Sequence, residues 1–318
     1  MAPLRLIAGS GRSGTTWVLD VLTVANKLRP VFEPLHPLTC GEVAQRYANR
    51  YLTRMDRQDD LAEFIEAAAA GQLNNMWVNY RSISRLLDVR LKRFGSVASV
   101  KKWVRDWQAM LRRVQEYRPL MRHPETIVKV IRGNLMLDWL SANFPLRTIF
   151  LVRHPAAVIE SQLRYEIAWE PSRILARYSE DRALMTGPLA DYADFLNSSM
   201  SRAAAYTTVW AIQNMIPMAQ AKQNGYTVVF YEELLESPGT EWRRIVDALE
   251  LEQMPETDLL NQPSQQATRD IGESSYAKSY AKWRQALSTE ELEEIQRTLD
   301  RFSIDCYRVD QERPVLSG

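Results

Sequence analysis

The chain has 318 residues, of which 46% are hydrophobic and 25% charged, and its formal net charge is +1. This composition is that of a globular protein and excludes a disordered or fibrous chain. The length is enough to bury a sizeable core, the near-neutral charge gives no argument for an anionic partner, and nothing resembles a nucleic-acid recognition module.

The cysteines and the lengths of the apolar segments indicate the cellular compartment. Cys40 and Cys306 lie far apart, and neither has a second Cys or a His at a ligand spacing. A disulfide framework or a zinc site is therefore not expected, and a reducing compartment fits. No segment has the length of a signal peptide core or of a membrane span. We expect a cytoplasmic protein without stable membrane insertion, and the sequence carries no signal for an oligomeric state.

Short apolar segments alternate with helical patterns, which is typical of an α/β fold with a parallel sheet. We expect a P-loop-type central parallel β-sheet flanked by helices. A capping box at Ser288 and Glu291 predicts the start of the last helix, and Pro217 is a site for a kink in the longest one. The predicted strands are residues 4–8, 30–32, 126–131, 147–152 and 227–230, and the predicted helices are 14–27, 134–143, 155–166, 201–223, 239–249 and 289–301.

Two segments, 41–122 and 165–200, interrupt this alternation with helical or irregular patterns that are rich in aromatic residues. Ligands of open α/β sheets bind at the carboxyl ends of the strands. We therefore expect one domain, 1–318, in which these segments are helical insertions that form a substrate lid. Within segment 41–122, four apolar residues at helical spacing form one stripe, which either packs in the core or lines an acceptor pocket. These residues are Trp103, Trp107, Leu111 and Val114.

The first of these segments also carries most of the positive charge. Residues 81–122 hold twelve Lys and Arg against three acids. Such a run is either a solvated helix face or a surface that attracts an acidic acceptor.

Residues 9–16, Gly-Ser-Gly-Arg-Ser-Gly-Thr-Thr, follow a predicted strand and open a predicted helix. The glycines allow backbone N–H groups to turn inward, and the helix N-terminus adds partial positive charge, so the loop is suited to a phosphate or a sulfate. Its frame matches G-x-x-x-x-G, but Thr15 stands where a Walker A loop has Lys. The cation is at Arg12 instead.

The missing lysine favours one kind of nucleotide over another. A Walker A lysine reaches the β- and γ-phosphates, and Mg²⁺ is held by a Ser/Thr and a strand-end Asp. Here the corresponding strand ends in Arg153 rather than Asp. Since no metal ligand is evident, we expect no metal, and a 5′-phosphosulfate fits the loop better than a triphosphate.

Arg153 also begins a second anchor. Pro155 occupies the first position of the next helix, and Ser161, eight residues after Arg153, falls about two turns into it. A guanidinium with a hydroxyl suits an additional phosphate that ATP lacks. The alternative is that Arg153 forms a structural ion pair.

These motifs resemble those of a known family. Residues 9–17 resemble the 5′-phosphosulfate loop of the superfamily of sulfotransferases that use 3′-phosphoadenosine-5′-phosphosulfate (PAPS), in particular its bacterial and carbohydrate-sulfotransferase-like branch. Arg153 and Ser161 match its 3′-phosphate pair. Residues 32–36 resemble the family's segment after the loop helix. Residues 228–238 resemble its late strand, which carries an aromatic residue that covers the adenine. Residues 282–288 resemble its C-terminal tryptophan segment.

The resemblance implies an enzyme with PAPS as co-substrate and 3′,5′-bisphosphoadenosine as product. The basic loop that cytosolic members place before the tryptophan is absent, and Arg269, Lys278 and Lys282 are the nearby substitutes. Arg12 in place of Lys is the variant found in carbohydrate, tyrosyl-protein and bacterial members. The implied cofactor contacts are Gly11, Arg12, Ser13, Gly14, Thr15, Thr16, Trp17, Arg153, Ser161, Tyr231, Lys278 and Lys282.

Sulfuryl transfer needs a base for the acceptor, cations on the bridging oxygen and in-line positioning. The family places a base near Glu33, which could instead be a solvated turn acid. His36, three residues after Glu33, is the other candidate for the base. The alternative is that His36 is a loop histidine that is hydrogen-bonded to the backbone. The family also places a lysine that touches the transferring group; Lys129 matches it, and a buried strand tolerates Lys poorly unless it is paired. Arg132 either contacts the transferring group as well or caps its strand.

The remaining histidines, His123 and His154, each precede a proline and are expected to be structural. The leading hypothesis is therefore transfer of a sulfuryl group to a hydroxyl or amine of a small-molecule, lipid or carbohydrate acceptor. Two other hypotheses stay open from the sequence: a P-loop nucleotide kinase and a non-catalytic nucleotide-binding protein.

Overall fold

The computed structural model describes residues 3–73, 75–80, 107–108, 111, 115, 118–164, 170–260 and 280–315. Residues 81–106 of the first predicted insertion lie outside the described residues, as do two members of the aromatic stripe and two of the substitute cations; these are Trp103, Val114, Arg269 and Lys278.

Five strands form one sheet in which every pairing is parallel, in the order β2-β3-β1-β4-β5. All five predicted strands are present, with bounds that match to within one residue, and the α/β fold with a central parallel sheet is confirmed. The carboxyl ends of all five strands meet at one edge. The strands are β1 (Leu4–Gly9), β2 (Arg29–Phe32), β3 (Thr126–Val130), β4 (Leu146–Val152) and β5 (Thr227–Phe230).

The predicted helices are present, with one difference at 134–143. There the chain first makes a 3₁₀ turn, Asn134–Met136, and the α-helix begins only afterwards. The helices predicted from the sequence are α1 (Thr15–Asn26), α7 (Leu137–Asn143), α8 (Pro155–Arg164), α12 (Arg202–Asn224), α14 (Pro238–Ala248) and α17 (Thr289–Arg301).

Local signals explain two of the helix boundaries. At the start of α17 the predicted capping box is present: Ser288 Oγ accepts from Glu291 N (3.2 Å), and the Glu291 carboxylate accepts from Ser288 N (2.8 Å). Pro217 lies inside α12, which continues past it and ends at Gly225 in the left-handed conformation.

Further helices surround this frame, several of them in the two predicted insertions. Among the described residues none is long and apolar enough to cross a membrane. These helices are α2 (Gly41–Tyr47), α3 (Asp59–Ala69), α4 (Met76–Tyr80), α9 (Pro171–Glu180), α10 (Arg182–Thr186), α11 (Ala193–Leu196), α13 (Tyr231–Glu236), α15 (Thr257–Leu260) and α16 (Trp283–Ala286).

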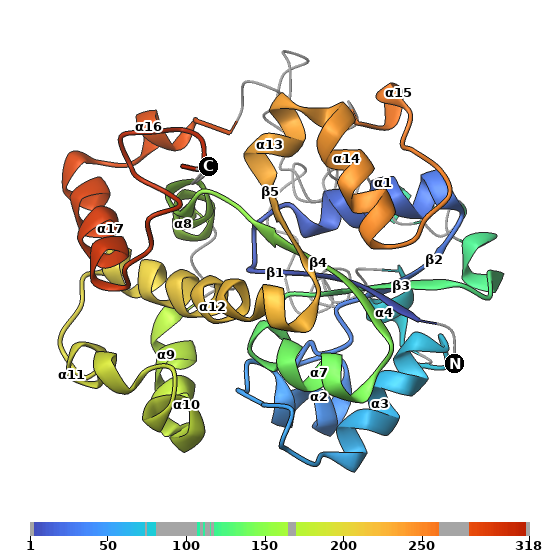
Figure 1. The fold of residues 1–318 in the computed structure, drawn as a ribbon, viewed down its shortest axis with the longest axis horizontal. Coiled ribbons are helices and arrows are strands. Elements are labelled where there is room, and N and C mark those ends of the chain that lie inside the picture. Colours follow the sequence, from blue (N-terminus) through green and yellow to red (C-terminus); the bar gives the residue numbers. More distant parts are fainter. Residues whose placement is uncertain are drawn as a thin grey trace, which may run out of the picture.

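Helices cover both faces of the sheet (Figure 1): α1 and α14 lie on one, and α3, α7 and α12 on the other. Alternation along the strands produces this arrangement. In β1, Leu6 and Ala8 point to the cluster that contains Trp139, whereas Ile7 points to the cluster that contains Trp17. Because both faces are buried, the strands are apolar runs, as expected for a parallel sheet.

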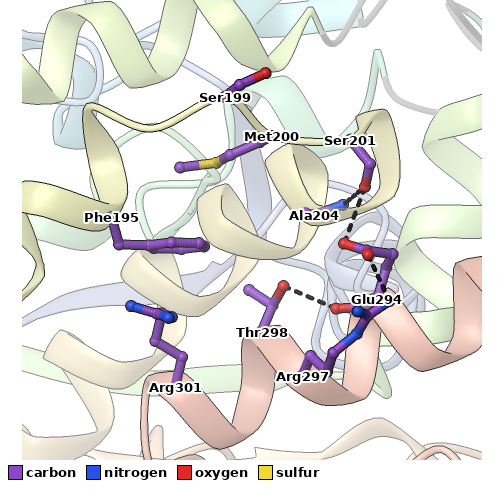
Figure 2. Close-up of a pocket in the computed structure, with 9 residues that line it drawn as sticks. All are labelled: Phe195, Ser199, Met200, Ser201, Ala204, Glu294, Arg297, Thr298 and Arg301. Atoms are coloured by element: carbon purple, nitrogen blue, oxygen red, sulfur yellow. Dashed lines mark hydrogen bonds and ion pairs between the residues drawn. The ribbon is translucent and has the colours of Figure 1, made fainter.

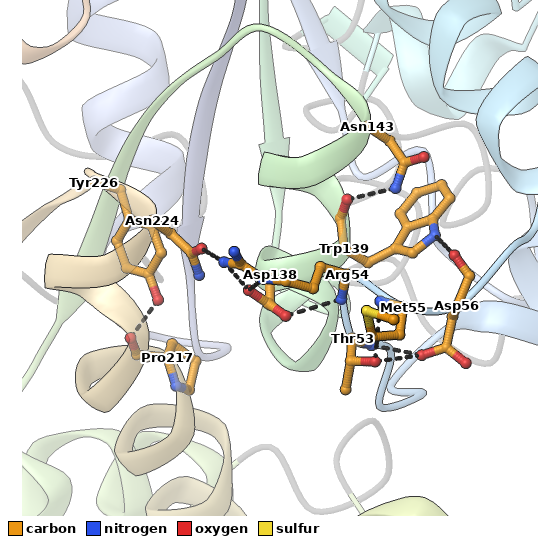
Figure 3. Close-up of polar contacts among 10 residues, drawn as sticks. All are labelled: Thr53, Arg54, Met55, Asp56, Asp138, Trp139, Asn143, Pro217, Asn224 and Tyr226. Carbon is orange, nitrogen blue, oxygen red and sulfur yellow. Dashed lines mark hydrogen bonds and ion pairs between the residues drawn. The ribbon is translucent and has the colours of Figure 1, made fainter.

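On the α7 face, Arg54 fastens the segment after α2 to the body of the fold (Figure 3). Its backbone N–H donates to Asp138 Oδ2 (2.8 Å), and its guanidinium donates to Asp138 Oδ1 (2.8 and 3.1 Å) and to Asn224 Oδ1 (2.8 Å). One side chain therefore joins this segment to α7 and to the end of α12.

Asp138→Asn is expected to lower the free energy of unfolding by about 1–2 kcal/mol at pH 7. Burial raises the pKa of Asp138, but the hydrogen bonds and charge of Arg54 lower it further than that, and the net pKa is below the ordinary value. The stabilisation is therefore present above the unfolded pKa of about 4 and is lost as the pH falls through the lower folded pKa.

Urea denaturation of the two proteins between pH 7 and pH 3 measures this dependence. The matched control is Asp247→Asn, which removes an exposed carboxylate from α14. A difference between Asp138→Asn and wild type that is the same at both pH values would contradict the role given to the Asp138 charge.

Candidate active site

The loop at 9–16, between β1 and α1, folds back on itself. Ser13 N donates to Ser10 O (3.2 Å), and the two hydroxyl oxygens lie 2.6 Å apart. Arg12 and Gly14 have left-handed backbones, with φ of 73° and 92°. Gly14 provides no side-chain cap for α1, so the N–H groups of the first helical turn are available to an anion.

A neighbouring ring requires the glycine at position 14. A Cβ there would lie 2.5 Å from the ring of Tyr231, the first residue of α13. Tyr231 packs edge-to-face on Trp17 (5.9 Å between centroids) and lies beneath the Arg153 guanidinium (4.6 Å). The ring is almost fully buried and forms part of the loop's wall. Its contact with adenine stays a prediction.

The structure brings together the two anchors that the sequence identified separately. Arg12 Nε donates to Ser161 Oγ (2.8 Å), and Arg153 Nη1 donates to Arg12 O (3.1 Å). The loop cation, the strand-end cation and the helix hydroxyl therefore form one continuous group across the ends of β1 and β4.

Arg153 does not form the structural ion pair that the sequence left open. Within the described ranges no carboxylate lies within ion-pair distance of its guanidinium, and its Nε is buried without a hydrogen-bond partner. A buried donor left unsatisfied costs free energy. This donor is available to a ligand.

Two polar side chains that the sequence did not single out support the loop. Gly9 N donates to Asn134 Oδ1 (3.3 Å), and Gln162 Nε2 donates to Gly11 O (3.5 Å). Asn134 follows the end of β3, which is a signal that sequence inspection could have used. Gln162 carried no such signal, because a polar residue in a helix is ordinary.

At the end of β2, Glu33 is 1% exposed and lies between two cations. Lys129 Nζ is hydrogen-bonded to Glu33 Oε1, and Arg132 Nη1 donates to Oε2 (3.4 Å), as does the backbone N–H of Ile131 (3.3 Å). The reading of Glu33 as a solvated turn acid is wrong, because the carboxylate is buried and paired.

Strand register explains this meeting. Phe32 is the partner of Lys129 in the β2–β3 ladder, and Glu33 N donates to Lys129 O (2.9 Å). The chain then turns at Glu33 with φ of 48°, an uncommon conformation for a residue with a Cβ. Lys129 also lies over the Phe32 ring (4.6 Å), so its buried ammonium has two favourable contacts.

His36 lies just beyond, half-buried against Trp77 (4.7 Å between ring centroids), with Nδ1 3.0 Å from Thr39 Oγ1. Burial, followed by the charge of Arg132, lowers the pKa of His36 to about 4. The ring is therefore neutral at pH 7 and can accept a proton.

The C-terminal candidates are only partly described. Lys278 lies outside the described residues. Lys282 is exposed and precedes Trp283, whose ring stacks on His154 (4.5 Å between centroids). His154 directly follows Arg153, so this segment packs beside the strand-end cation. His154 itself is fully buried, and both ring nitrogens are bonded to backbone groups.

A separate cavity of about 570 Å³ lies between α17 and the segment that joins α11 to α12 (Figure 2). Glu294 there pairs with Arg297 (2.6 Å), and Arg301 lies over the Phe195 ring (4.6 Å). None of the predicted site residues lines this cavity; the lining residues are Phe195, Ser199, Met200, Ser201, Ala204, Glu294, Arg297, Thr298 and Arg301.

These features define a class of protein. A loop and helix N-terminus at the carboxyl edge of a parallel sheet, with arginines in place of a Walker lysine and aspartate, define a P-loop-like protein whose site is suited to an anionic ligand. No group of three or more His, Cys, Asp or Glu that could hold a metal occurs in the described part of the chain.

Comparison with known proteins supplies the family. Residues 3–256 match the model of the sulfotransferase family. The chain belongs to that family and is an enzyme that transfers a sulfuryl group to an acceptor. No curated protein matches the chain significantly.

Three solved structures are similar to the chain over most of its length. The sulfotransferase domain of the Synechococcus PCC 7002 olefin synthase is 21% identical, with 95% of each chain covered and a TM-score of 0.46. The sulfotransferase domain from the curacin biosynthetic pathway is 16% identical, with 95% and 98% covered and a TM-score of 0.44. Sulfotransferase STF9 from Mycobacterium avium is 13% identical, with 99% and 72% covered and a TM-score of 0.32.

Gly14→Ala is expected to lower the free energy of unfolding by about 2–4 kcal/mol, because the added methyl group meets the Tyr231 ring and the backbone has a positive φ. The matched control is Gly225→Ala. Gly225 has φ of 70°, but a Cβ there meets nothing within 4 Å, so only the conformational cost of about 1 kcal/mol applies. Thermal denaturation compares the two. Equal losses would contradict the clash with Tyr231.

Proposed function

We propose that this chain transfers the sulfuryl group of PAPS to a hydroxyl or amine of a small-molecule, lipid or carbohydrate acceptor, and releases 3′,5′-bisphosphoadenosine. The observation that carries the proposal is the continuous Arg12–Ser161–Arg153 group beside a capless helix N-terminus. It offers two arginines, one in the loop after β1 and one at the end of β4. A nucleotide with separate 5′ and 3′ anions requires two such cations.

In this proposal the loop and its helix hold the 5′-phosphosulfate, through backbone N–H groups and Arg12. Arg153 and Ser161 hold the 3′-phosphate. The buried Nε of Arg153 supports this role, because a phosphate oxygen would supply an acceptor that the described part of the chain does not give it. Tyr231 contributes to the adenine side. Lys282, which precedes the Trp283 ring stacked on His154, would approach the same nucleotide.

Transfer proceeds by attack of the acceptor oxygen or nitrogen on sulfur, as the bond between sulfur and the bridging oxygen of the 5′-phosphate breaks. The acceptor proton passes to a protein base. The electron pair stays on the bridging oxygen, where Lys129 and Arg12 offset the developing charge. The product leaves with the sulfuryl group, and atoms and charge balance without an oxidant or a metal.

Glu33 is the proposed base, with His36 as the alternative. In the free protein Glu33 Oε1 accepts a hydrogen bond from Lys129, so this oxygen is occupied. Movement of Lys129 toward the bridging oxygen would release it. His36, neutral at pH 7, needs no such release, but its pKa of about 4 makes it a weak base.

The acceptor would enter over the carboxyl edge of the sheet, between the predicted insertions 41–122 and 165–200. We propose that both insertions belong to a single domain, 1–318, and form the acceptor side of the site. The apolar and aromatic residues there are compatible with each of the three acceptor classes.

Bisphosphoadenosine is expected to raise the melting temperature, whereas ATP with Mg²⁺ should not. At a ligand concentration of about 100 times Kd the stabilisation is about 2.7 kcal/mol. Arg153→Ala should remove most of it, because the 3′-phosphate loses its guanidinium. Differential scanning fluorimetry with both ligands makes the measurement.

The control for this experiment is Arg147→Ala, which removes an exposed arginine from the amino-terminal end of the same strand. It should leave the ligand-induced shift unchanged. Stabilisation by ATP with Mg²⁺ alone would refute the use of PAPS, and an unchanged shift in Arg153→Ala would refute the 3′-phosphate assignment.

Glu33→Gln is expected to lower kcat at least about 100-fold, as removal of a general base does, with the Kd for bisphosphoadenosine kept within about threefold. Labelled PAPS with a panel of hydroxyl and amine acceptors measures turnover. His36→Asn should reduce kcat less than about tenfold.

Because Glu33→Gln also removes the carboxylate charge that pairs with Lys129 and Arg132, its fold is checked by circular dichroism and nucleotide binding. Glu241→Gln is the matched control: Glu241 is also buried and paired with an arginine, Arg244, but lies on α14. Normal turnover in Glu33→Gln together with a large loss in His36→Asn would transfer the role of base to His36.

A further inference from the structure

A second buried carboxylate, Glu232, lies where β4 and β5 end. It is 0% exposed and follows Tyr231 in α13. Within the described residues no Lys or Arg lies within ion-pair distance of it, in contrast to Glu33. A carboxylate buried in this way is costly unless hydrogen bonds compensate it, and the catalytic proposal above gives it no role.

Two hydrogen bonds hold Glu232. Its Oε1 accepts from the backbone N–H of His154 (2.9 Å), and its Oε2 accepts from the hydroxyl of Tyr307 (2.6 Å). Tyr307 is fully buried and comes from the segment after α17. The carboxylate therefore joins three parts of the chain: the end of β4, the start of α13 and the C-terminal segment.

The C-terminal segment encloses His154 as well. His154 Nε2 lies 3.1 Å from Arg308 O and 3.1 Å from Gln311 O, while its Nδ1 accepts from Ala156 N (3.2 Å). Its ring is stacked on Trp283 and contacts Tyr307 edge-to-face. Trp283 and Tyr307 both lie beyond residue 256, where the match to the family model ends.

Glu232 and one of its partners, His154, are each adjacent in sequence to a wall of the proposed nucleotide site. His154 follows Arg153, and Glu232 follows Tyr231, whose ring lies under the Arg153 guanidinium. The backbone that carries the cation and the backbone that carries its supporting ring are thus joined by one carboxylate. Among the described residues, the Arg153 side chain makes one hydrogen bond, to Arg12 O.

We propose that Glu232 and Tyr307 are positioning residues that hold Arg153 in the orientation that recognises the 3′-phosphate, so that the C-terminal segment determines the preference for a 3′-phosphorylated nucleotide. The inference rests on the proposed function, which assigns the 3′-phosphate to Arg153. The physical ground is that a bidentate guanidinium contact is lost by a displacement of about 1 Å. Neither residue touches the nucleotide.

The test compares two nucleotides that differ only in the 3′-phosphate: 3′,5′-bisphosphoadenosine and adenosine 5′-monophosphate. The Kd of adenosine 5′-monophosphate divided by the Kd of bisphosphoadenosine, both from isothermal titration calorimetry, measures recognition of the 3′-phosphate. Tyr307→Phe removes one hydroxyl and is expected to lower this ratio about tenfold, by weakening bisphosphoadenosine binding while adenosine 5′-monophosphate binds as before. Glu232→Ala should lower it at least as much.

Two further variants distinguish positioning from general damage. Glu232→Gln keeps the side-chain shape and can still accept from His154 N and bond to Tyr307, so the ratio should not fall. Tyr206→Phe is the matched control: its hydroxyl is also buried, but has no hydrogen-bond partner in the described part of the chain, and the ratio should be unchanged.

Each result has a definite meaning. Equal weakening of both nucleotides in Tyr307→Phe, or an unchanged ratio, would overturn the positioning role and leave the C-terminal segment as a structural anchor. If wild type binds both nucleotides equally, the assignment of the 3′-phosphate to Arg153 fails, and the proposed function fails with it. Since Glu232→Ala opens a buried cavity and could unfold the chain, Tyr307→Phe decides the question alone.

Discussion

The buried group of Glu33, Lys129 and Arg132 is the constraint on which the carboxyl edge of the sheet depends. An unpaired charge buried in that position would cost several kcal/mol. Removal of one charged side chain would therefore destabilise the fold, because the opposite charge beside it would lose its partner. The pairing thus requires β2 to lie beside β3 in one register, with Phe32 opposite Lys129 and the chain turning sharply at Glu33. A slip of one residue would turn Lys129 to the other face.

The opposite half of the edge is organised in another way. There Arg153 bonds to a backbone carbonyl, Arg12 O, and lies on the Tyr231 ring, while Arg12 bonds to the Ser161 hydroxyl. A carbonyl and a ring orient the Arg153 guanidinium without neutralising it. An anionic ligand therefore gains more from Arg153 than it would from a cation already held by a carboxylate.

Spacing along the chain predicted the strands, the loop and the Arg153–Ser161 pair, because each depends on residues within about ten positions of one another. The resemblance to the sulfotransferase family identified Glu33 and Lys129 singly. Neither the resemblance nor the spacing could predict that they bind each other, since 96 residues separate them and strand register decides the contact. For the same reason Tyr307, 75 residues from Glu232, carried no signal. The glycine at 14 was predicted to free the backbone, whereas the nearby Tyr231 ring is a second reason for it.

Under the proposed roles the two halves of the edge act together during transfer. Lys129 has one ammonium group, and in the free protein Glu33 holds it. As negative charge develops on the bridging oxygen, the ammonium is drawn there, and the Glu33 oxygen that it had occupied becomes open to the acceptor proton. Proton acceptance at Glu33 and charge stabilisation at the leaving group are then consequences of the same movement, while Arg132 keeps the carboxylate from being left without a counter-charge.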